Sequence, residues 1–106
     1  MLAWFLVALA ALPRVGLVVR PQVTQVGYTL SVECRVPRAA DNRQLDMGLA
    51  GWSVSSRVLD GEQAPVIYTQ RLTAPCDPDL TAFCLLTTAD GQTFRARQAV
   101  LVIGCS

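Results

Sequence analysis

The strongest structural signal in the chain is the alternation of residues 28–36, which read YTLSVECRV. Apolar or cysteine side chains occupy one face: Tyr28, Leu30, Val32, Cys34 and Val36. A period of two over nine residues predicts a half-buried β-strand, and Pro37, which has no N–H group, ends it. The chain must therefore form a sheet that has Cys34 on its buried side.

Other segments predict further strands. Residues 17–20 form a short strand before Pro21, and residues 66–72 are rich in β-branched and aromatic side chains. Residues 45–54 alternate, and Gly48 and Gly51 suggest a bulge before Trp52. Residues 38–44 and 74–79 read as polar loops. We expect an all-β fold of about six to seven strands.

The last two strands, residues 80–88 and 92–103, flank Ala89, Asp90 and Gly91. An x-Asp-Gly loop suits a three-residue hairpin connection. That connection pairs residues whose numbers sum to 180. It turns Cys84 to the apolar face and places Arg95 and Arg97 on the other face. A two-residue turn would set apolar residues against the arginines, so we favour the three-residue loop.

The chain has four cysteines, with no CxxC pair and no histidine to complete a zinc site. The cysteine count is even, and all four lie after an apolar N-terminal segment that reads as an export signal, as described below. This combination predicts disulfides. Cys34 and Cys84 both face inward, and the hairpin register brings Cys76 within one residue of facing Cys105. We therefore favour the bonds Cys34–Cys84 and Cys76–Cys105. The main alternative pairs Cys34 with Cys105 and Cys76 with Cys84.

Residues 1–12 read MLAWFLVALAAL and end at Pro13 and Arg14. A membrane-spanning helix needs about 20 apolar residues, whereas this run has the length of a signal-peptide core, with Ala8 and Ala10 as small residues near a cleavage point. We predict a signal peptide within residues 1–13, or an uncleaved N-terminal hydrophobic helix. One exported domain over residues 17–105 follows it, secreted or periplasmic.

The composition narrows the function classes. There is no histidine, and all nine basic residues are arginine. His-dependent triads, HExxH zinc sites, P-loop lysines and lysine Schiff bases are therefore ruled out. The net charge of +1 gives no basic excess for nucleic acid or anionic membranes. We expect a non-catalytic binding or structural module without a cofactor, whose partner is a protein or a cell-envelope component. Arginine-only basic residues suggest a bacterial source.

Two surfaces are candidates for binding. One is the outer sheet face that bears Arg95 and Arg97, part of an outward-facing arginine set with Arg35 and Arg71. The other consists of the loops 38–44 and 74–79, expected at one end of the domain.

Other chemistries receive weaker support. Asp77 and Asp79 with Asp60 or Glu62 have the oxygen ligands that calcium prefers, although an Asp/Pro turn in solvent is the simpler interpretation. A serine nucleophile among residues 53, 55 and 56 has no histidine or lysine to activate it.

A small secreted enzyme inhibitor is one alternative function. A hydrolase that uses two carboxylates is another, and it requires two of the acidic side chains to converge. The available acids are Glu33, Asp46, Asp60, Glu62, Asp77, Asp79 and Asp90.

Taken together, these residues resemble an immunoglobulin-like β-sandwich. The resemblance rests on an inward Cys34 on an early strand, Trp52 downstream, an inward Cys84 on the penultimate strand and a final hairpin. It covers residues 17–103. It implies two antiparallel sheets packed face to face, with Trp52 in the core against the Cys34–Cys84 bond.

Overall fold

A computed structural model describes residues 13–105, so the predicted N-terminal signal segment or helix lies almost entirely outside the described residues. The described part contains one 3-10 turn, η1 (Gly61–Gln63), and eight strands. The strands are β1 (Gly16–Arg20), β2 (Val23–Gln25), β3 (Thr29–Arg35), β4 (Asn42–Leu49), β5 (Ser53–Val58), β6 (Ile67–Thr73), β7 (Leu80–Thr88) and β8 (Thr93–Ile103).

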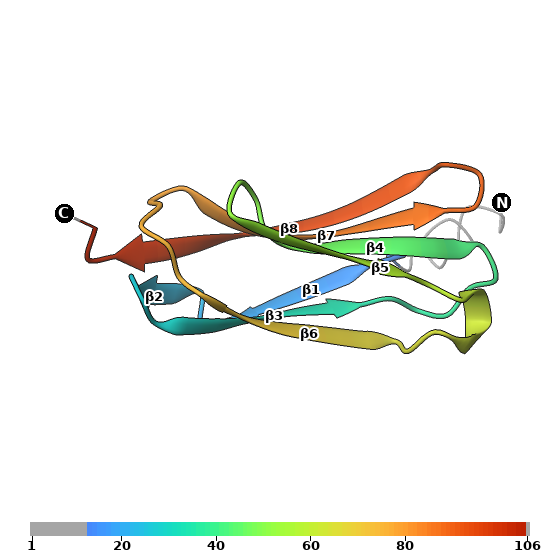
Figure 1. The fold of residues 1–106 in the computed structure, drawn as a ribbon, viewed down its shortest axis with the longest axis horizontal. Coiled ribbons are helices and arrows are strands. Elements are labelled where there is room, and N and C mark those ends of the chain that lie inside the picture. Colours follow the sequence, from blue (N-terminus) through green and yellow to red (C-terminus); the bar gives the residue numbers. More distant parts are fainter. Residues whose placement is uncertain (1–12, 106) are drawn as a thin grey trace, which may run out of the picture.

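The strands form two layers, visible edge-on in Figure 1. One sheet has the order β1-β3-β6 and the other the order β2-β8-β7-β4-β5. All neighbours are antiparallel except β2 and β8, which run parallel, with Val23 beside Leu101. The prediction of an all-β fold is confirmed. Eight strands form where about six to seven were expected. Residues 45–54 contribute to two strands, β4 and β5, and the short strand β2 was not predicted.

Gly51 lies in a hairpin turn between β4 and β5, where the sequence predicted a bulge, and Gly48 is a paired residue near the end of β4. Gly48 has a φ of 147° and Gly51 a φ of 80°, and the Trp52 N–H donates to the Leu49 carbonyl at 3.0 Å. The chain therefore reverses between β4 and β5. A bulge-like irregularity occurs at the start of β4 instead, between Asn42 and Gln44, where the pairing of β4 with β7 shifts.

The predicted loop 38–44 is also shorter than expected, because β4 begins at Asn42. Asn42 is buried, and its Nδ2 donates to the Pro37 carbonyl at 3.0 Å. Its Oδ1 accepts a hydrogen bond from Arg14 Nη2 at 2.8 Å, and the same guanidinium pairs with Asp41 at 2.7 Å. These bonds join the segment before β1 to the β3–β4 connection.

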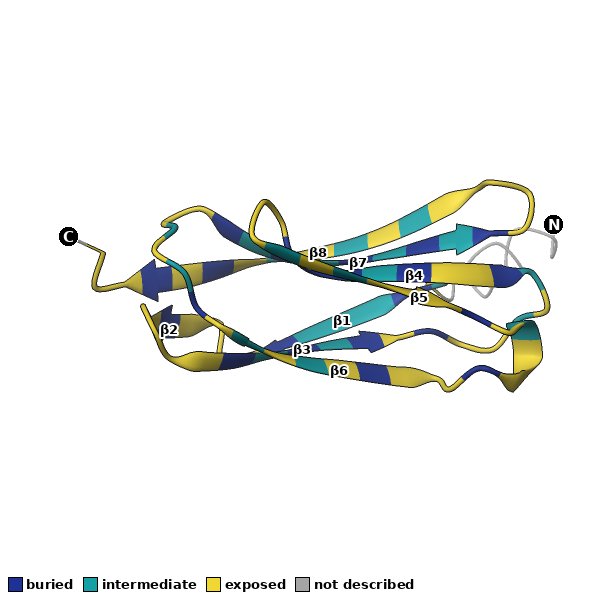
Figure 2. Ribbon diagram, viewed as in Figure 1, coloured by how far each residue is buried: buried dark blue, intermediate teal, exposed yellow. Residues whose placement is uncertain are grey.

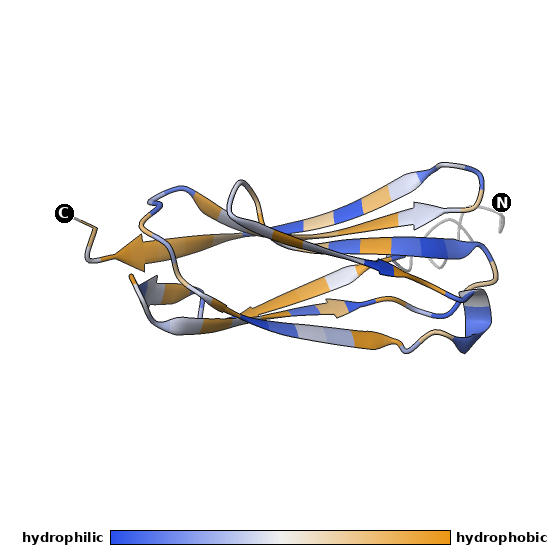
Figure 3. Ribbon diagram, in the orientation of Figure 1, coloured by the Kyte–Doolittle hydropathy of each residue, from blue (hydrophilic) through white to orange (hydrophobic). Residues whose placement is uncertain are grey.

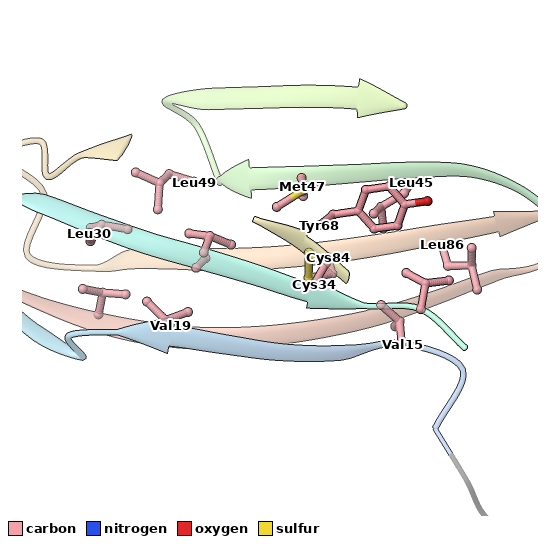
Figure 4. Packing of buried hydrophobic residues seen from close by; sticks show 14 of the residues in the cluster. Val15, Val19, Leu30, Cys34, Leu45, Met47, Leu49, Tyr68, Cys84 and Leu86 are labelled. Carbon is pink, nitrogen blue, oxygen red and sulfur yellow. A yellow bond between two sulfur atoms is a disulfide. The ribbon is translucent and has the colours of Figure 1, made fainter. Parts of the chain in front are cut away.

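The core follows the alternation in β3 and β7. Leu30, Val32 and Cys34 are buried on β3, and every second residue of β7 from Leu80 is buried (Figure 2). Tyr28 departs from the prediction, because it precedes the strand and is 61% exposed. The two apolar faces meet between the sheets (Figure 4).

Both favoured disulfides are present. The β7–β8 register is the one predicted, since Cys84 pairs with Ala96 and the residue numbers sum to 180. The Gly91 N–H donates to the Thr88 carbonyl at 3.0 Å and closes the turn. Cys34–Cys84 joins the two sheets inside the core (Figure 4), and Cys76–Cys105 joins the β6–β7 loop to the segment after β8.

Trp52 is not in the core, contrary to the expectation from the immunoglobulin-like pattern. It lies in the β4–β5 turn, is 55% exposed, and donates from Nε1 to Asp77 Oδ2 at 2.8 Å. The strand registers place Met47 opposite Cys84 and Tyr68 opposite Cys34. These two side chains occupy the region around the buried disulfide (Figure 4).

Candidate functional site

The strongest candidate site lies on the outer face of the five-stranded sheet, meaning the side turned away from the three-stranded sheet. Since Cys84 faces the core, its neighbours Phe83 and Leu85 face outward. The register sets Arg97 opposite Phe83 and Arg95 opposite Leu85. Both arginines are exposed, and Phe83 is half-buried. Figure 3 shows hydrophilic bands alternating with more apolar ones in the middle of β8, and a hydrophobic stretch toward its end.

A hollow lies beside Phe83 on this face. Gly48 lies between Phe83 on β7 and Val54 on β5 in the same row of the sheet. A Cβ on Gly48 would lie 2.0 Å from the Ser53 carbonyl oxygen, so the backbone admits only glycine there. The hollow has a volume of about 410 Å³. Its lining residues are Ala50, Gly51, Val54, Thr81, Phe83, Arg95 and Arg97.

The two arginines have no acidic partner within residues 13–105. The ion pairs of this part of the chain are Arg14–Asp41 and Arg35–Glu33. A guanidinium presents a planar fork of donors that matches the oxygens of a carboxylate, sulfate or phosphate. The hollow therefore combines an apolar floor with two unpaired cationic groups.

The other predicted arginines lie elsewhere. Arg35 and Arg71 belong to β3 and β6 of the three-stranded sheet. The Arg35 Nε donates to Glu33 Oε2 at 2.6 Å. They do not join Arg95 and Arg97 in one site.

The two candidate binding loops do not lie at one end of the domain, so that expectation is wrong. The β3–β4 connection is at the end where the described chain begins, and the β6–β7 connection is at the end where it finishes (Figure 1).

The proposed calcium ligands are separated in the same way. Asp60 precedes η1 and Glu62 lies within it. Both are at the opposite end of the molecule from Asp77 and Asp79 (Figure 1). Asp77 instead accepts hydrogen bonds from Trp52 Nε1 and, at 2.9 Å, from the Asp79 N–H. Across the described residues, no group of three or more Asp, Glu, Cys or His side chains has metal-site geometry.

The serines of β5 are strand residues. Ser55 Oγ donates to Gln70 Oε1 at 3.3 Å and links β5 to β6 across the two sheets.

The sequence predicted the two arginines of this site but not the hollow beside them. Phe83 lies between two inward residues, so the hairpin register already placed it on the arginine face. The position of Val54 depends on the β4–β5 turn, where the sequence predicted a bulge.

The chain is similar in fold to proteins of known structure. The sulfur carrier protein SoxY from Chlorobium limicola f thiosulfatophilum has a TM-score of 0.70 and 14% identity, over 96% of this chain and 94% of that one. A superoxide reductase (neelaredoxin) variant from Ignicoccus hospitalis has a TM-score of 0.68 and 12% identity, over 92% of this chain and 86% of that one. At such low identity the likeness concerns the fold alone.

The comparisons with sequences found no relatives: no protein-family model matches the chain, and no curated protein matches it. In the described part of the chain, no helix has the length and apolar character needed to cross a membrane.

Proposed function

We propose that this chain is a non-catalytic, immunoglobulin-like binding domain that works outside the cytoplasm and holds a protein or cell-envelope partner on its outer sheet face. The observation that carries the proposal is the hollow in which Arg95 and Arg97, without acidic partners in the described part of the chain, flank Phe83.

The location outside the cytoplasm is supported by the two disulfides. Disulfides form and persist in oxidising compartments and are rare in reducing ones. The apolar N-terminal segment with Ala8 and Ala10 is consistent with secretion or export to the periplasm.

The chemistry of the hollow defines the group it would recognise. Two guanidinium forks select an anionic group, and the Phe83 and Val54 side chains favour an apolar or aromatic group next to that anion. The similarity to a sulfur carrier and to superoxide reductases supports the fold and brings neither activity to this chain.

The proposal is tested with N-acetyl-phenylalanine, which carries a carboxylate beside an aromatic ring. Titration of the isotopically labelled protein should shift the amide resonances of Phe83, Arg95 and Arg97. The double variant R95S/R97S should lose these shifts. The matched control R35S/R71S removes two arginines from the other sheet and should keep them. N-acetyl-phenylalaninamide, which has no carboxylate, should produce much smaller shifts.

The same variants separate binding from folding. R95S/R97S should change the free energy of unfolding by less than about 1 kcal/mol, as surface substitutions usually do. A loss of several kcal/mol would mean that the arginines are structural. Equal shifts for the acid and the amide, or shifts that survive in R95S/R97S, would contradict the binding site. Hydrolytic turnover abolished by one Asp or Glu substitution would contradict the non-catalytic assignment.

A further inference from the structure

Strand β5 is an open edge of the five-stranded sheet. The opposite edge, β2, has three residues, whereas β5 has six, with the sequence SVSSRV. An edge strand presents unpaired N–H and C=O groups, and proteins commonly protect such edges with proline, charged side chains or a bulge. Neither proline nor lysine occurs in β5. Its one charged side chain, Arg57, lies over the Tyr68 ring at 5.7 Å.

The register with β4 shows which backbone groups are free. Residues of β4 and β5 pair when their numbers sum to 102, and the Leu59 N–H continues this ladder to the Arg43 carbonyl at 2.8 Å. Hydrogen-bonded pairs alternate along an antiparallel ladder. Odd-numbered residues of β5 therefore bond to β4, and the backbone groups of Val54, Ser56 and Val58 point to the open edge.

The side chains of the same three residues point to the outer face. Their order, Val-Ser-Val, is identical in the two chain directions. Val54 is 56% exposed and Val58 is 91% exposed, with Ser56 midway between them. An antiparallel copy of β5 centred on Ser56 would set Val54 opposite Val58 of the second copy. Ser56 would face its own equivalent. Each of these pairs would exchange two backbone hydrogen bonds.

Charges do not oppose this arrangement. In the register centred on Ser56, Arg57 falls opposite Ser55 of the second copy and not opposite the equivalent arginine. Valine pairs across strands are favourable, and like charges directly opposite each other are avoided.

We propose that two copies of this chain associate through β5 into a symmetric dimer with a continuous sheet across the two-fold axis. The proposal does not rest on the arginines of the hollow, although Val54 belongs to both the hollow and the β5 edge. One strand from each copy makes a small interface, below about 1,200 Å², so association is weak and depends on concentration. The contact uses the same edge on both copies and therefore closes at two subunits.

The test places a charge on the two-fold axis. Ser56→Lys and Ser56→Glu each set like charges opposite each other in the dimer, while Ser56 is exposed in the monomer. Each variant should weaken dimerisation at least about fivefold, the equivalent of about 1 kcal/mol. An equimolar mixture of the two variants should associate again, because an ammonium group on one copy then faces a carboxylate on the other. Sedimentation of the full chain over a range of concentrations measures each case.

Thr93→Lys and Thr93→Glu serve as matched controls, since Thr93 is exposed on the same sheet but lies on β8, away from the β5 edge. They should dimerise like the unmodified chain. Amide exchange at Val54, Ser56 and Val58 should slow as concentration rises, while the Leu59 N–H, already bonded to Arg43, stays constant. A monomer at millimolar concentration, an assembly larger than a dimer, or equal behaviour of the Ser56 and Thr93 variants would overturn the proposal.

Discussion

At the scale of single residues, Tyr68 stands out because its buried hydroxyl group makes no hydrogen bond within the described residues. It lies on β6 opposite Cys34 and is 7% exposed. Burial raises the pKa of Tyr68 above its ordinary value near 10, and the nearby Arg57 guanidinium offsets part of that increase. The ring packs well, but the hydroxyl group loses its hydration without gaining a bond in return.

The first prediction is that Tyr68→Phe leaves the free energy of unfolding at pH 7 unchanged or raises it by up to about 1 kcal/mol. The pH dependence has a definite sign. Above pH 10 the unfolded chain releases the phenolic proton while the folded chain retains it, so stability falls as pH rises through and above 10. Urea unfolding from pH 8 to 11 should show a steeper fall in the unmodified protein than in Tyr68→Phe. Parallel curves would contradict the raised pKa.

At the scale of elements, the β4–β5 hairpin determines the shape of the outer face. Gly48 allows the backbone of β4 to approach Ser53, and Gly51 supplies the positive φ of the turn. The turn carries Trp52 outward to Asp77 and places Val54 beside Phe83. The hollow and the open β5 edge both depend on this reversal of the chain.

The second prediction compares the two glycines. Gly48→Ala should lower the free energy of unfolding by more than about 3 kcal/mol, because its Cβ would overlap the Ser53 carbonyl in a backbone conformation that disfavours side chains. Gly51→Ala should cost about 1 to 2 kcal/mol, since it meets the same conformational cost but has no heavy atom within 4 Å of the new Cβ. Thermal and urea unfolding measure both. Equal losses would show that the close approach at Gly48 is relieved by backbone movement.

At the scale of the whole molecule, the two disulfides have different roles. Cys34–Cys84 closes a sequence separation of 50 residues and crosses from one sheet to the other, with both cysteines fully buried. Cys76–Cys105 closes a separation of 29 residues at one end of the molecule, and both of its cysteines are exposed. The first holds the layers together, and the second holds the end of β8 to the β6–β7 loop.

The third prediction follows from this difference in access. A mild reductant followed by alkylation should label Cys76 and Cys105 first, and Cys34 and Cys84 only when the domain unfolds. The paired variant Cys34→Ala/Cys84→Ala should lose about 4 kcal/mol or more, from chain entropy and a core cavity. Cys76→Ser/Cys105→Ser should lose no more than about 3.5 kcal/mol. Mass spectrometry of the alkylated peptides gives the order, and early labelling of Cys34 would contradict it.

Features that arise between near neighbours in the chain follow from the amino-acid sequence alone. The period of two in residues 28–36 directed Cys34 inward, and the Ala89-Asp90-Gly91 turn determined the β7–β8 register. Together they led to the all-β fold and both cysteine pairs. Strand alternation and hairpin turns act over a few residues, so their outcome can be derived locally.

Features that depend on how distant segments meet arise only in the folded molecule. The reversal of the chain between β4 and β5 placed the two candidate loops at opposite ends, and the sheet order left β5 as an edge. Asn42 became buried because Arg14 and Pro37 converge on it. Trp52 became exposed because it lies in the β4–β5 turn, where its Nε1 reaches Asp77 of the β6–β7 loop. Each of these outcomes depends on contacts between residues far apart in sequence, and no local pattern encodes which segments those will be.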